Sequence, residues 1–275
     1  MSETGGFVSG FLKRIARAIR RPTAPVAPSS ASPLLAYIDA TQLAPPDALV
    51  RLGTMYGGWI IPADPGLDAN SVCYLAGAGE DISFDCALAQ RFHCKIRIVD
   101  PTPRAVEHFN LLGQATREGR RFPVNNSETE FYDITVADFS RMSFLPVGLA
   151  DRDVELKFYL PKNPAHVSCS TVNLQKTEDY FTANCYRLDT VMVQQGDKKV
   201  DLLKMDIEGA EYSVIRDLVK SSLLPRILLI EFDEAHTPLD DEAGSRIGDH
   251  IRQLVQVGMR CIAVDGCNAT FVRTR

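Results

Sequence analysis

The sequence lacks the features that mark several common classes of protein. Its seven cysteines are odd in number and include no Cys-x-x-Cys pair, so the pattern predicts neither a disulfide framework nor a zinc site. No apolar run reaches the roughly 18 residues needed to cross a bilayer, and the first residues lack the apolar core of a secretory signal. We therefore expect a cytoplasmic protein with free thiols.

Basic charge is also scarce. Lys and Arg number 30 against 35 Asp and Glu, which gives a formal net charge of −5 at pH 7. This balance provides no broad positive surface for a phosphate backbone, so we expect no nucleic-acid partner. The apolar content of 45% over 275 residues can fill the core of one large domain. The single tryptophan, Trp59, fits a core anchor better than a binding platform.

The chain divides into a tail, a linker and one domain. Within residues 1–21, four apolar residues recur at intervals of four among five basic ones: Phe7, Phe11, Ile15 and Ile19 with Lys13, Arg14, Arg17, Arg20 and Arg21. This predicts a short cationic amphipathic helix, which fits either peripheral contact with the inner face of a membrane through residues 7–21 or a loosely attached tail. Residues 22–33 are rich in Pro, Ala and Ser and predict an extended linker, and residues 34–275 form the expected domain.

From Ser71 onward, short apolar runs alternate with stretches of helical periodicity, which is typical of β-α-β units on a parallel sheet. The expected strands are Val72–Ala76, Lys95–Val99, Phe144–Leu149, Asp201–Met205 and Ile227–Phe232. The period-two stretch Val154–Leu160 predicts an inserted antiparallel strand near the edge of the sheet. Arg260–Val264 and Ala269–Arg273, joined by a tight turn, predict a final hairpin. The expected fold class is α/β, with a doubly wound, Rossmann-like sheet that is mostly parallel and ends in an antiparallel hairpin.

A turn with two glycines follows the first expected strand. Gly77, Ala78 and Gly79 lead into a helix-like stretch at Ile82–Phe92, and glycine is needed where the backbone bends sharply and approaches a ligand. Asp100 ends the second expected strand, near the roughly 20-residue spacing at which an acidic side chain accepts hydrogen bonds from ribose hydroxyls. Together these residues predict a nucleoside site.

The residues that follow discriminate between nucleoside cofactors. Glu80 and Asp81 stand at the start of the expected helix, and the third glycine of the dinucleotide fingerprint is missing. Two acids in this place would repel a diphosphate and suit a cation. The chain also has no Tyr-x-x-x-Lys pair, which short-chain dehydrogenases use as acid and base. This favours S-adenosylmethionine, a sulfonium, over NAD, although a nucleotide-dependent oxidoreductase stays open as an alternative.

Five segments, in this order, resemble the FkbM family of O-methyltransferases: YLAGAGEDISFD (74–85), VDPTPR (99–104), HVSCSTVNLQK (166–176), LKMDIEGAE (203–211) and IEFDE (230–234). The resemblance covers about residues 56 to 265, and the fourth segment is its most specific part because two acids and a glycine follow directly after a buried strand. It implies methyl transfer from S-adenosylmethionine, in characterised relatives to a hydroxyl of a sugar or polyketide-like product. Most methyltransferases of this kind share the expected sheet plan.

Carboxylates follow the fourth and fifth expected strands. Open α/β sheets bind ligands outside the carboxyl ends of their strands, so Asp206 and Glu231 line one cleft if the two strands are adjacent and parallel. Methyl transfer to a hydroxyl needs a group that takes the proton, and Asp206, beside the expected methyl group, is the first candidate, with Glu231 and His166 as the others. Asp206, Glu231 and Asp233 could instead hold Mg²⁺, so the involvement of a metal stays open.

Two further acids, Glu208 and Glu211, are as well explained by stabilisation of a helix N-terminus as by a role in a site. The expected function is an S-adenosylmethionine-dependent O-methyltransferase that acts on a small, polar, hydroxylated acceptor such as a saccharide or glycoconjugate. A non-catalytic, membrane-peripheral binding module on the same fold is a further alternative. The sequence leaves the oligomeric state open.

Overall fold

The computed structural model describes residues 32–162, 169–171 and 177–274. The amphipathic helix expected at residues 7–21 lies outside this part of the chain. At its start, the Ser32 hydroxyl donates a hydrogen bond to the Gly266 carbonyl oxygen at 2.6 Å. Three short 3-10 helices follow: η1 (Pro33–Ala36), η2 (Ala40–Gln42) and η3 (Pro46–Ala48). Within the described ranges, no helix has the length and apolarity that a membrane crossing requires.

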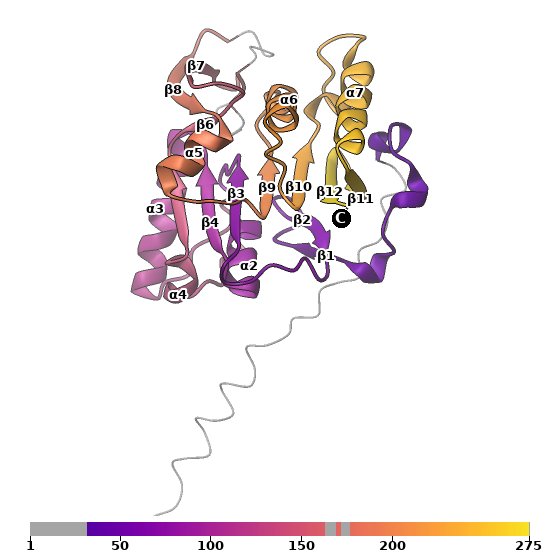
Figure 1. Cartoon of the computed structure of the whole chain (residues 1–275). Coiled ribbons are helices and arrows are strands. Elements are labelled where there is room, and N and C mark those ends of the chain that lie inside the picture. Colours follow the sequence, from indigo (N-terminus) through magenta and orange to yellow (C-terminus); the bar gives the residue numbers. More distant parts are fainter. Residues whose placement is uncertain (1–31, 163–168, 172–176, 275) are drawn as a thin grey trace, which may run out of the picture.

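A seven-stranded sheet forms the centre of the molecule, in the order β11-β12-β10-β9-β3-β4-β5 (Figure 1). Its strands are β3 (Val72–Ala76), β4 (Lys95–Val99), β5 (Met142–Leu145), β9 (Leu202–Met205), β10 (Ile227–Glu231), β11 (Met259–Asp265) and β12 (Asn268–Arg273). The five strands from β10 to β5 run parallel, whereas β12 runs antiparallel to both β10 and β11. This confirms the expected α/β sheet, mostly parallel and closed by an antiparallel hairpin.

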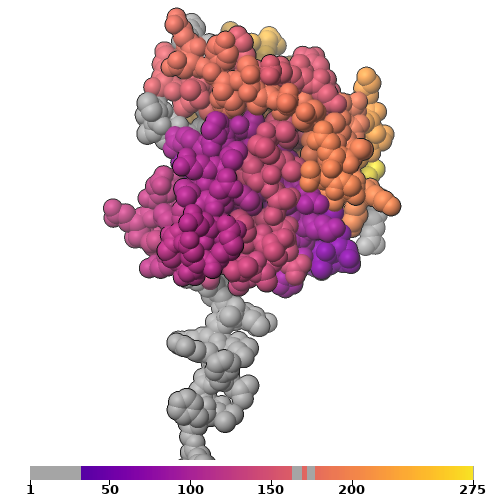
Figure 2. Space-filling view, turned by 90° about the vertical axis from the view of Figure 1, so that its left-hand side faces the viewer, coloured from indigo at the N-terminus to yellow at the C-terminus, as the bar shows by residue number. Residues whose placement is uncertain are grey.

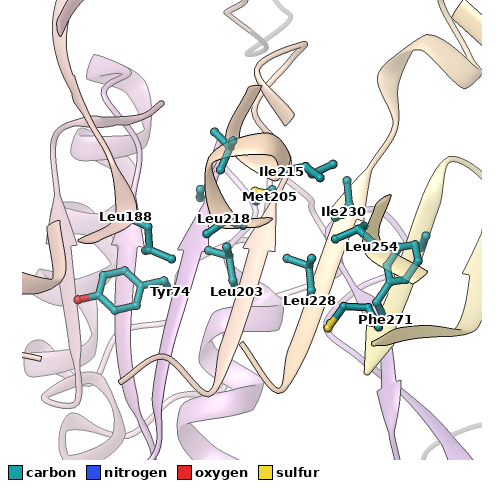
Figure 3. Packing of buried hydrophobic residues seen from close by; sticks show 14 of the residues in the cluster. Tyr74, Leu188, Leu203, Met205, Ile215, Leu218, Leu228, Ile230, Leu254 and Phe271 are labelled. Atoms are coloured by element: carbon teal, nitrogen blue, oxygen red, sulfur yellow. The ribbon is translucent and has the colours of Figure 1, made fainter. Parts of the chain in front are cut away.

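Each face of the sheet has its own core. The helices are α2 (Ser83–Phe92), α3 (Pro103–Glu118), α4 (Val136–Phe139), α5 (Leu188–Gln195), α6 (Glu211–Ser221), α7 (Ala243–Gln256) and the 3-10 helix η4 (Asp233–Ala235). Because strand side chains alternate in direction, Tyr74 of β3 joins the core beneath α5, α6 and α7, while Leu75 joins the core beneath α2 and α3. In the first core, Leu218 of α6 and Leu254 of α7 belong to the same cluster as Leu228 of β10 (Figure 3).

One expected strand is divided between two sheets. Phe144–Leu149 was expected to be continuous, but β5 ends at Leu145 and Gly148–Leu149 forms β6 in a separate three-stranded sheet. Pro146 lies between them and has no backbone N–H to continue the ladder. The expectation of one continuous strand was wrong because an apolar run does not reveal which neighbouring strand its backbone groups pair with.

The separate sheet has the order β6-β8-β7. The expected antiparallel strand is confirmed as β7 (Val154–Tyr159), but it lies in this sheet and not at the edge of the large one, because it pairs with the unexpected β8 (Tyr180–Tyr186). The small sheet stands beyond the carboxyl ends of the parallel strands (Figure 1). Figure 2 shows it as the salmon-coloured upper part of one face, above the magenta residues of α3.

A second unexpected element precedes the large sheet. β1 (Leu49–Leu52) and β2 (Trp59–Pro62) form an antiparallel hairpin. Most of its buried residues, Trp59 and Ile61 among them, pack in the same core as α2. The Thr270 hydroxyl of β12 donates a hydrogen bond to the Ile60 carbonyl oxygen at 2.5 Å. The hairpin is therefore fixed against the domain, and the turn that joins its two strands has a defined place.

Candidate functional site

A cavity of about 230 Å³ opens at the carboxyl ends of β3, β4, β9 and β10. The chain order reverses between β3 and β9, since β4 and β5 lie on one side of β3 and β9 and β10 on the other. Open α/β sheets bind ligands at such a switch point. The expected site residues that line this cavity are Gly77, Ala78, Gly79, Glu80, Asp81, Asp100, Asp206 and Glu231.

Gly77 occupies a position that only glycine can fill. Its φ is +81°, in the region that side chains avoid, and a Cβ added to it would lie 1.7 Å from the carbonyl oxygen of Asp206. Gly79 also has a positive φ, of +53°. The turn after β3 therefore lies directly against the backbone at the end of β9, and this contact brings the two halves of the site together.

Asp100 holds that glycine turn in shape. One carboxylate oxygen accepts hydrogen bonds from the backbone amides of Ala78, at 2.8 Å, and Gly79, at 3.1 Å. The other accepts from the backbone amide and the hydroxyl of Thr102, each at 2.7 Å. A carboxylate offers about four acceptor positions, so protein donors already engage them all. The sequence suggested that ribose hydroxyls would bind here, and the structure adds a role for Asp100 in shaping the loop.

Glu80 and Asp81 line the cavity, but their carboxylates also bind other parts of the chain. Glu80 forms a two-point ion pair with Arg104 of α3, at 3.1 and 2.7 Å. Asp81 accepts hydrogen bonds from the Thr54 hydroxyl, at 2.6 Å, and the Gly57 amide, at 3.2 Å, both in the turn between β1 and β2. These two acids therefore fasten neighbouring elements around the glycine turn.

Lys204 is a site residue that sequence reasoning missed. It lies on β9 and is 6% exposed, and its ammonium group donates to the Gly77 carbonyl oxygen at 2.5 Å and to Asp206 at 3.1 Å. It also lies 5.6 Å from the centre of the Trp59 ring. Burial lowers the pKa of Lys204, but the carboxylates of Asp206 and Asp85 raise it more, so the amine stays charged. The sequence feature that could have identified Lys204 is that it is the one charged residue in the otherwise apolar strand β9, which is buried along its whole length.

Asp206 and Glu231 line the same cavity, from the ends of the adjacent parallel strands β9 and β10. Burial, together with the charge and hydrogen bonding of Asp206, raises the pKa of Glu231 to about 9. Glu231 is therefore protonated at neutral pH. Two carboxyl groups in one site rarely ionise together, which agrees with the raised pKa of Glu231.

The third carboxyl of the expected metal group lies elsewhere. Asp233 is outside the cavity lining, and burial followed by the charges of Glu211 and Glu208 raises its pKa to about 10. Among the described residues, no group of three or more His, Cys, Asp or Glu side chains is arranged to hold a metal ion. The magnesium alternative therefore finds no support in this geometry.

Glu211 proves to be structural. It is 1% exposed, and its two carboxylate oxygens accept from the backbone amides of Ile207, at 2.9 Å, and Gly209, at 3.0 Å. It thus holds the loop after β9 at the start of α6. Glu208, in that loop, lines the cavity. Glu211 therefore stabilises the fold, whereas Glu208 lies at the site.

Other lining residues come from elements that carried no expected site residue. Tyr56, Gly57 and Trp59 belong to the β1–β2 hairpin, and Asn268 begins β12 with its buried Oδ1 unpaired. Leu149, Phe158, Cys169 and Thr171 extend the wall from the small sheet and its connections. His166, the third candidate base, lies outside the described residues.

Comparison with known proteins gives one result that bears on this site. The family model described as the methyltransferase FkbM domain matches residues 79–260, about two thirds of the chain. No curated protein matches the chain significantly. The matched segment contains β4, β9 and β10 and the acids at their ends, and it confirms the resemblance noted in the sequence. The protein is therefore a member of the FkbM methyltransferase family.

Proposed function

We propose that the protein transfers a methyl group from S-adenosylmethionine to a hydroxyl of a small polar acceptor of the saccharide type. The observation that carries this proposal is that the glycine turn after β3 and the end of β9 lie against each other at the switch point of the sheet. The glycine turn shaped by Asp100 lies against the end of β9, where Asp206 and Glu231 face the same cavity. A nucleoside site and a potential base are thus adjacent.

The chemistry of the lining suits this donor. When bound, S-adenosylmethionine supplies a methyl group activated by a sulfonium, together with an amino group that can donate hydrogen bonds. Glu208 lines the cavity, and Asn268, with its unpaired Oδ1, adds an acceptor to the lining. Glu80 and Asp81, at the start of α2, give the cavity a charge that opposes a diphosphate.

In this proposal Asp206 takes the proton from the acceptor hydroxyl. An aliphatic hydroxyl is a very weak acid, so its proton must leave as the new bond to carbon forms. Lys204 holds the Asp206 carboxylate in one orientation through the 3.1 Å ion pair. Glu231, protonated at neutral pH, is suited to donate a hydrogen bond to the acceptor oxygen or to Asp206 and thus to orient them. His166 remains a second candidate base from sequence alone.

Cofactor binding separates this function from the oxidoreductase alternative. Calorimetry on the full chain should give a saturable heat with S-adenosylhomocysteine and none with NAD at the same concentration. Gly77→Ala is the matched variant, because the added methyl group would collide with the Asp206 carbonyl and displace the glycine turn. It should bind S-adenosylhomocysteine at least about tenfold more weakly. Binding of NAD instead of S-adenosylhomocysteine would contradict the proposal.

A further inference from the structure

The turn between β1 and β2 supplies one wall of the cavity although it precedes the segment matched by the family model. The match begins at residue 79, whereas Tyr56 and Gly57 line the cavity from the hairpin at 49–62. The family match therefore assigns no role to this wall.

The turn is fastened at both ends. Thr54 donates a hydrogen bond from its hydroxyl to Asp81 at 2.6 Å, and its amide donates to the Ser83 hydroxyl at 2.9 Å. At the other end, the Gly57 amide donates to Asp81 at 3.2 Å. A Cβ at Gly57 would lie 2.5 Å from the Asp81 carboxyl carbon, so the turn approaches α2 as closely as glycine permits. These anchors hold Met55 and Tyr56, the residues between them, in place.

Met55 and Tyr56 are the most exposed parts of this turn. They are 81% and 73% exposed, a large uncovered apolar area beside a cavity. Tyr56 lines the cavity together with Asp206 and Glu231, and partial burial, followed by the charges of these two carboxyl groups, raises the pKa of its phenol. The described residues leave most of Tyr56 uncovered.

The charge of the cavity limits what can bind against that ring. Six carboxyl side chains line it: Glu80, Asp81, Asp100, Asp206, Glu208 and Glu231. Lys204 is the one ammonium group among the described lining residues, and it is already paired with Asp206. With Glu231 protonated and Glu80 paired with Arg104, the lining still carries more negative than positive charge. An acceptor that placed a carboxylate or phosphate beside Asp206 would be repelled at close range.

Resting on the proposed methyltransferase function, we propose that the Met55–Tyr56 turn is the acceptor-selecting wall of the site. The Tyr56 ring packs against the C–H face of a hydroxylated ring, and the surrounding carboxyl groups restrict the acceptor to molecules without an anionic group. Tyrosine suits this role because its rigid ring offers a large contact area while its hydroxyl tolerates water. Tyr56 is a positioning residue here, and the proton is removed elsewhere.

The first test compares neutral and anionic acceptors built on the same sugar ring. The full chain is given methyl-labelled S-adenosylmethionine and, in parallel, a neutral methyl hexopyranoside, the corresponding uronic acid and the corresponding hexose phosphate. We expect labelling of the neutral sugar with a kcat/KM at least about tenfold above that of either anionic sugar. Equal or preferred labelling of an anionic sugar would overturn the inference. Binding of S-adenosylhomocysteine without labelling of any of the three would also overturn it, while leaving the proposed donor intact.

The second test locates the wall with variants. Tyr56→Ala should raise KM for the neutral sugar about tenfold with kcat changed less than about threefold, and Tyr56→Phe should restore KM because it keeps the ring. Val193→Ala, on the outside of α5 where Val193 is 79% exposed, is the matched control and should change neither constant. Calorimetry with S-adenosylhomocysteine should give the same affinity for all variants within about twofold. Loss of that affinity in Tyr56→Ala would place the ring over the methyl donor and overturn the assignment, whereas absence of binding in the unmodified chain would contradict the proposed function itself.

Discussion

The ammonium group of Lys204 lies 3.1 Å from a carboxylate oxygen of Asp206, two residues along the same strand end. In a strand, residues i and i+2 point to the same side, so both side chains face the cavity. The same ammonium group donates to the carbonyl oxygen of Gly77 in the neighbouring turn. One buried cation therefore connects the expected donor site to the expected base.

Removal of this cation should destabilise the fold. Lys204→Met leaves Asp206 without its partner, and loss of one member of a buried pair typically costs about 3–5 kcal/mol. Because the Asp206 side chain is 31% exposed, we expect a smaller decrease, about 2–3 kcal/mol, in the free energy of unfolding in urea. Lys199→Met is the matched control, since Lys199 is 53% exposed and its ion pair with Asp201 should contribute less than about 1 kcal/mol. Equal losses in the two variants would show that burial of Lys204 has no special effect.

Asp100 should influence cofactor binding through the glycine turn. Asp100→Asn replaces one accepting oxygen by an amino group, which cannot accept the hydrogen bonds from Ala78 and Gly79 or from Thr102. We expect S-adenosylhomocysteine to bind at least about tenfold more weakly, as measured by calorimetry on the folded variant. Thr102→Val removes the hydroxyl that donates to Asp100 and so frees one acceptor position on that carboxylate. The affinity of this variant for S-adenosylhomocysteine should stay within about threefold of that of the unmodified protein. Unchanged affinity in Asp100→Asn would remove Asp100 from the site.

The raised pKa of Glu231 predicts a pH dependence of stability with a definite sign. Its pKa is about 9 in the folded protein against about 4.3 for an unperturbed glutamate, so the folded state holds a proton that the unfolded state releases in this range. The favourable contribution is fully present below about pH 4.3 and is lost as the pH rises toward 9. Glu231→Gln mimics the protonated form, so its stability relative to the unmodified protein should increase with pH.

Urea unfolding at pH 5, 7 and 9 would measure this difference. It should grow by up to about 1.4 kcal/mol per pH unit, which is the limit for one proton. Glu155→Gln, on the exposed side of β7, is the control and should give the same difference at each pH. A difference for Glu231→Gln that stays constant across the range would mean that Glu231 ionises normally in the folded state.

Two of the central strands, β3 and β4, were expected at the bounds they have. β3 is a short apolar run, β4 has apolar residues at Ile96, Ile98 and Val99, and Gly77 and Asp100 mark where the two strands end. β8 was missed because it mixes Thr182 and Asn184 with aromatic residues and lies half-exposed in the small sheet. The intrinsic strand propensity of its residues is too weak to identify β8, because its pairing partner, β7, is itself an insertion outside the large sheet.

The sequence was sufficient to predict which residues lie at the site, but not which contacts their side chains make. The acids at strand ends follow from the general geometry of parallel sheets, which is why Asp206 and Glu231 were expected together. The partners of Asp81 could not be found in this way, because the Thr54 turn is 27 residues away in the chain and meets α2 only through tertiary packing. Lys204 was missed for a related reason. Its place in the site depends on contacts with the Gly77 carbonyl, the Asp206 carboxylate and the Trp59 ring, which only folding brings together.

The basic N-terminal segment gives a prediction that concerns residues outside the described part of the chain. We propose that residues 7–21 contact anionic membranes, because their apolar side chains recur at helical spacing among basic ones. The full chain should float with anionic vesicles at low salt and less at high salt. Deletion of residues 1–31, which leaves Ser32 and its hydrogen bond to Gly266 intact, should abolish flotation. Arg14→Glu with Arg17→Glu is the control for charge, and flotation equal to that of the full chain would contradict an electrostatic contact.

Asp206 provides the most direct test of the proposed chemistry. Asp206→Asn preserves the shape of the side chain and removes its charge, so proton removal from the acceptor hydroxyl should fail while the glycine turn remains in place. We expect methyl transfer to fall about 10²-fold or more, with S-adenosylhomocysteine affinity changed less than about threefold. Glu231→Gln should lower transfer less than about tenfold, because Glu231 is already protonated at neutral pH and glutamine can still donate a hydrogen bond. Asp241→Asn, an exposed site outside the cavity, should have no effect. Normal turnover in Asp206→Asn would exclude Asp206 as the base, and a larger loss in Glu231→Gln than in Asp206→Asn would transfer that role to Glu231.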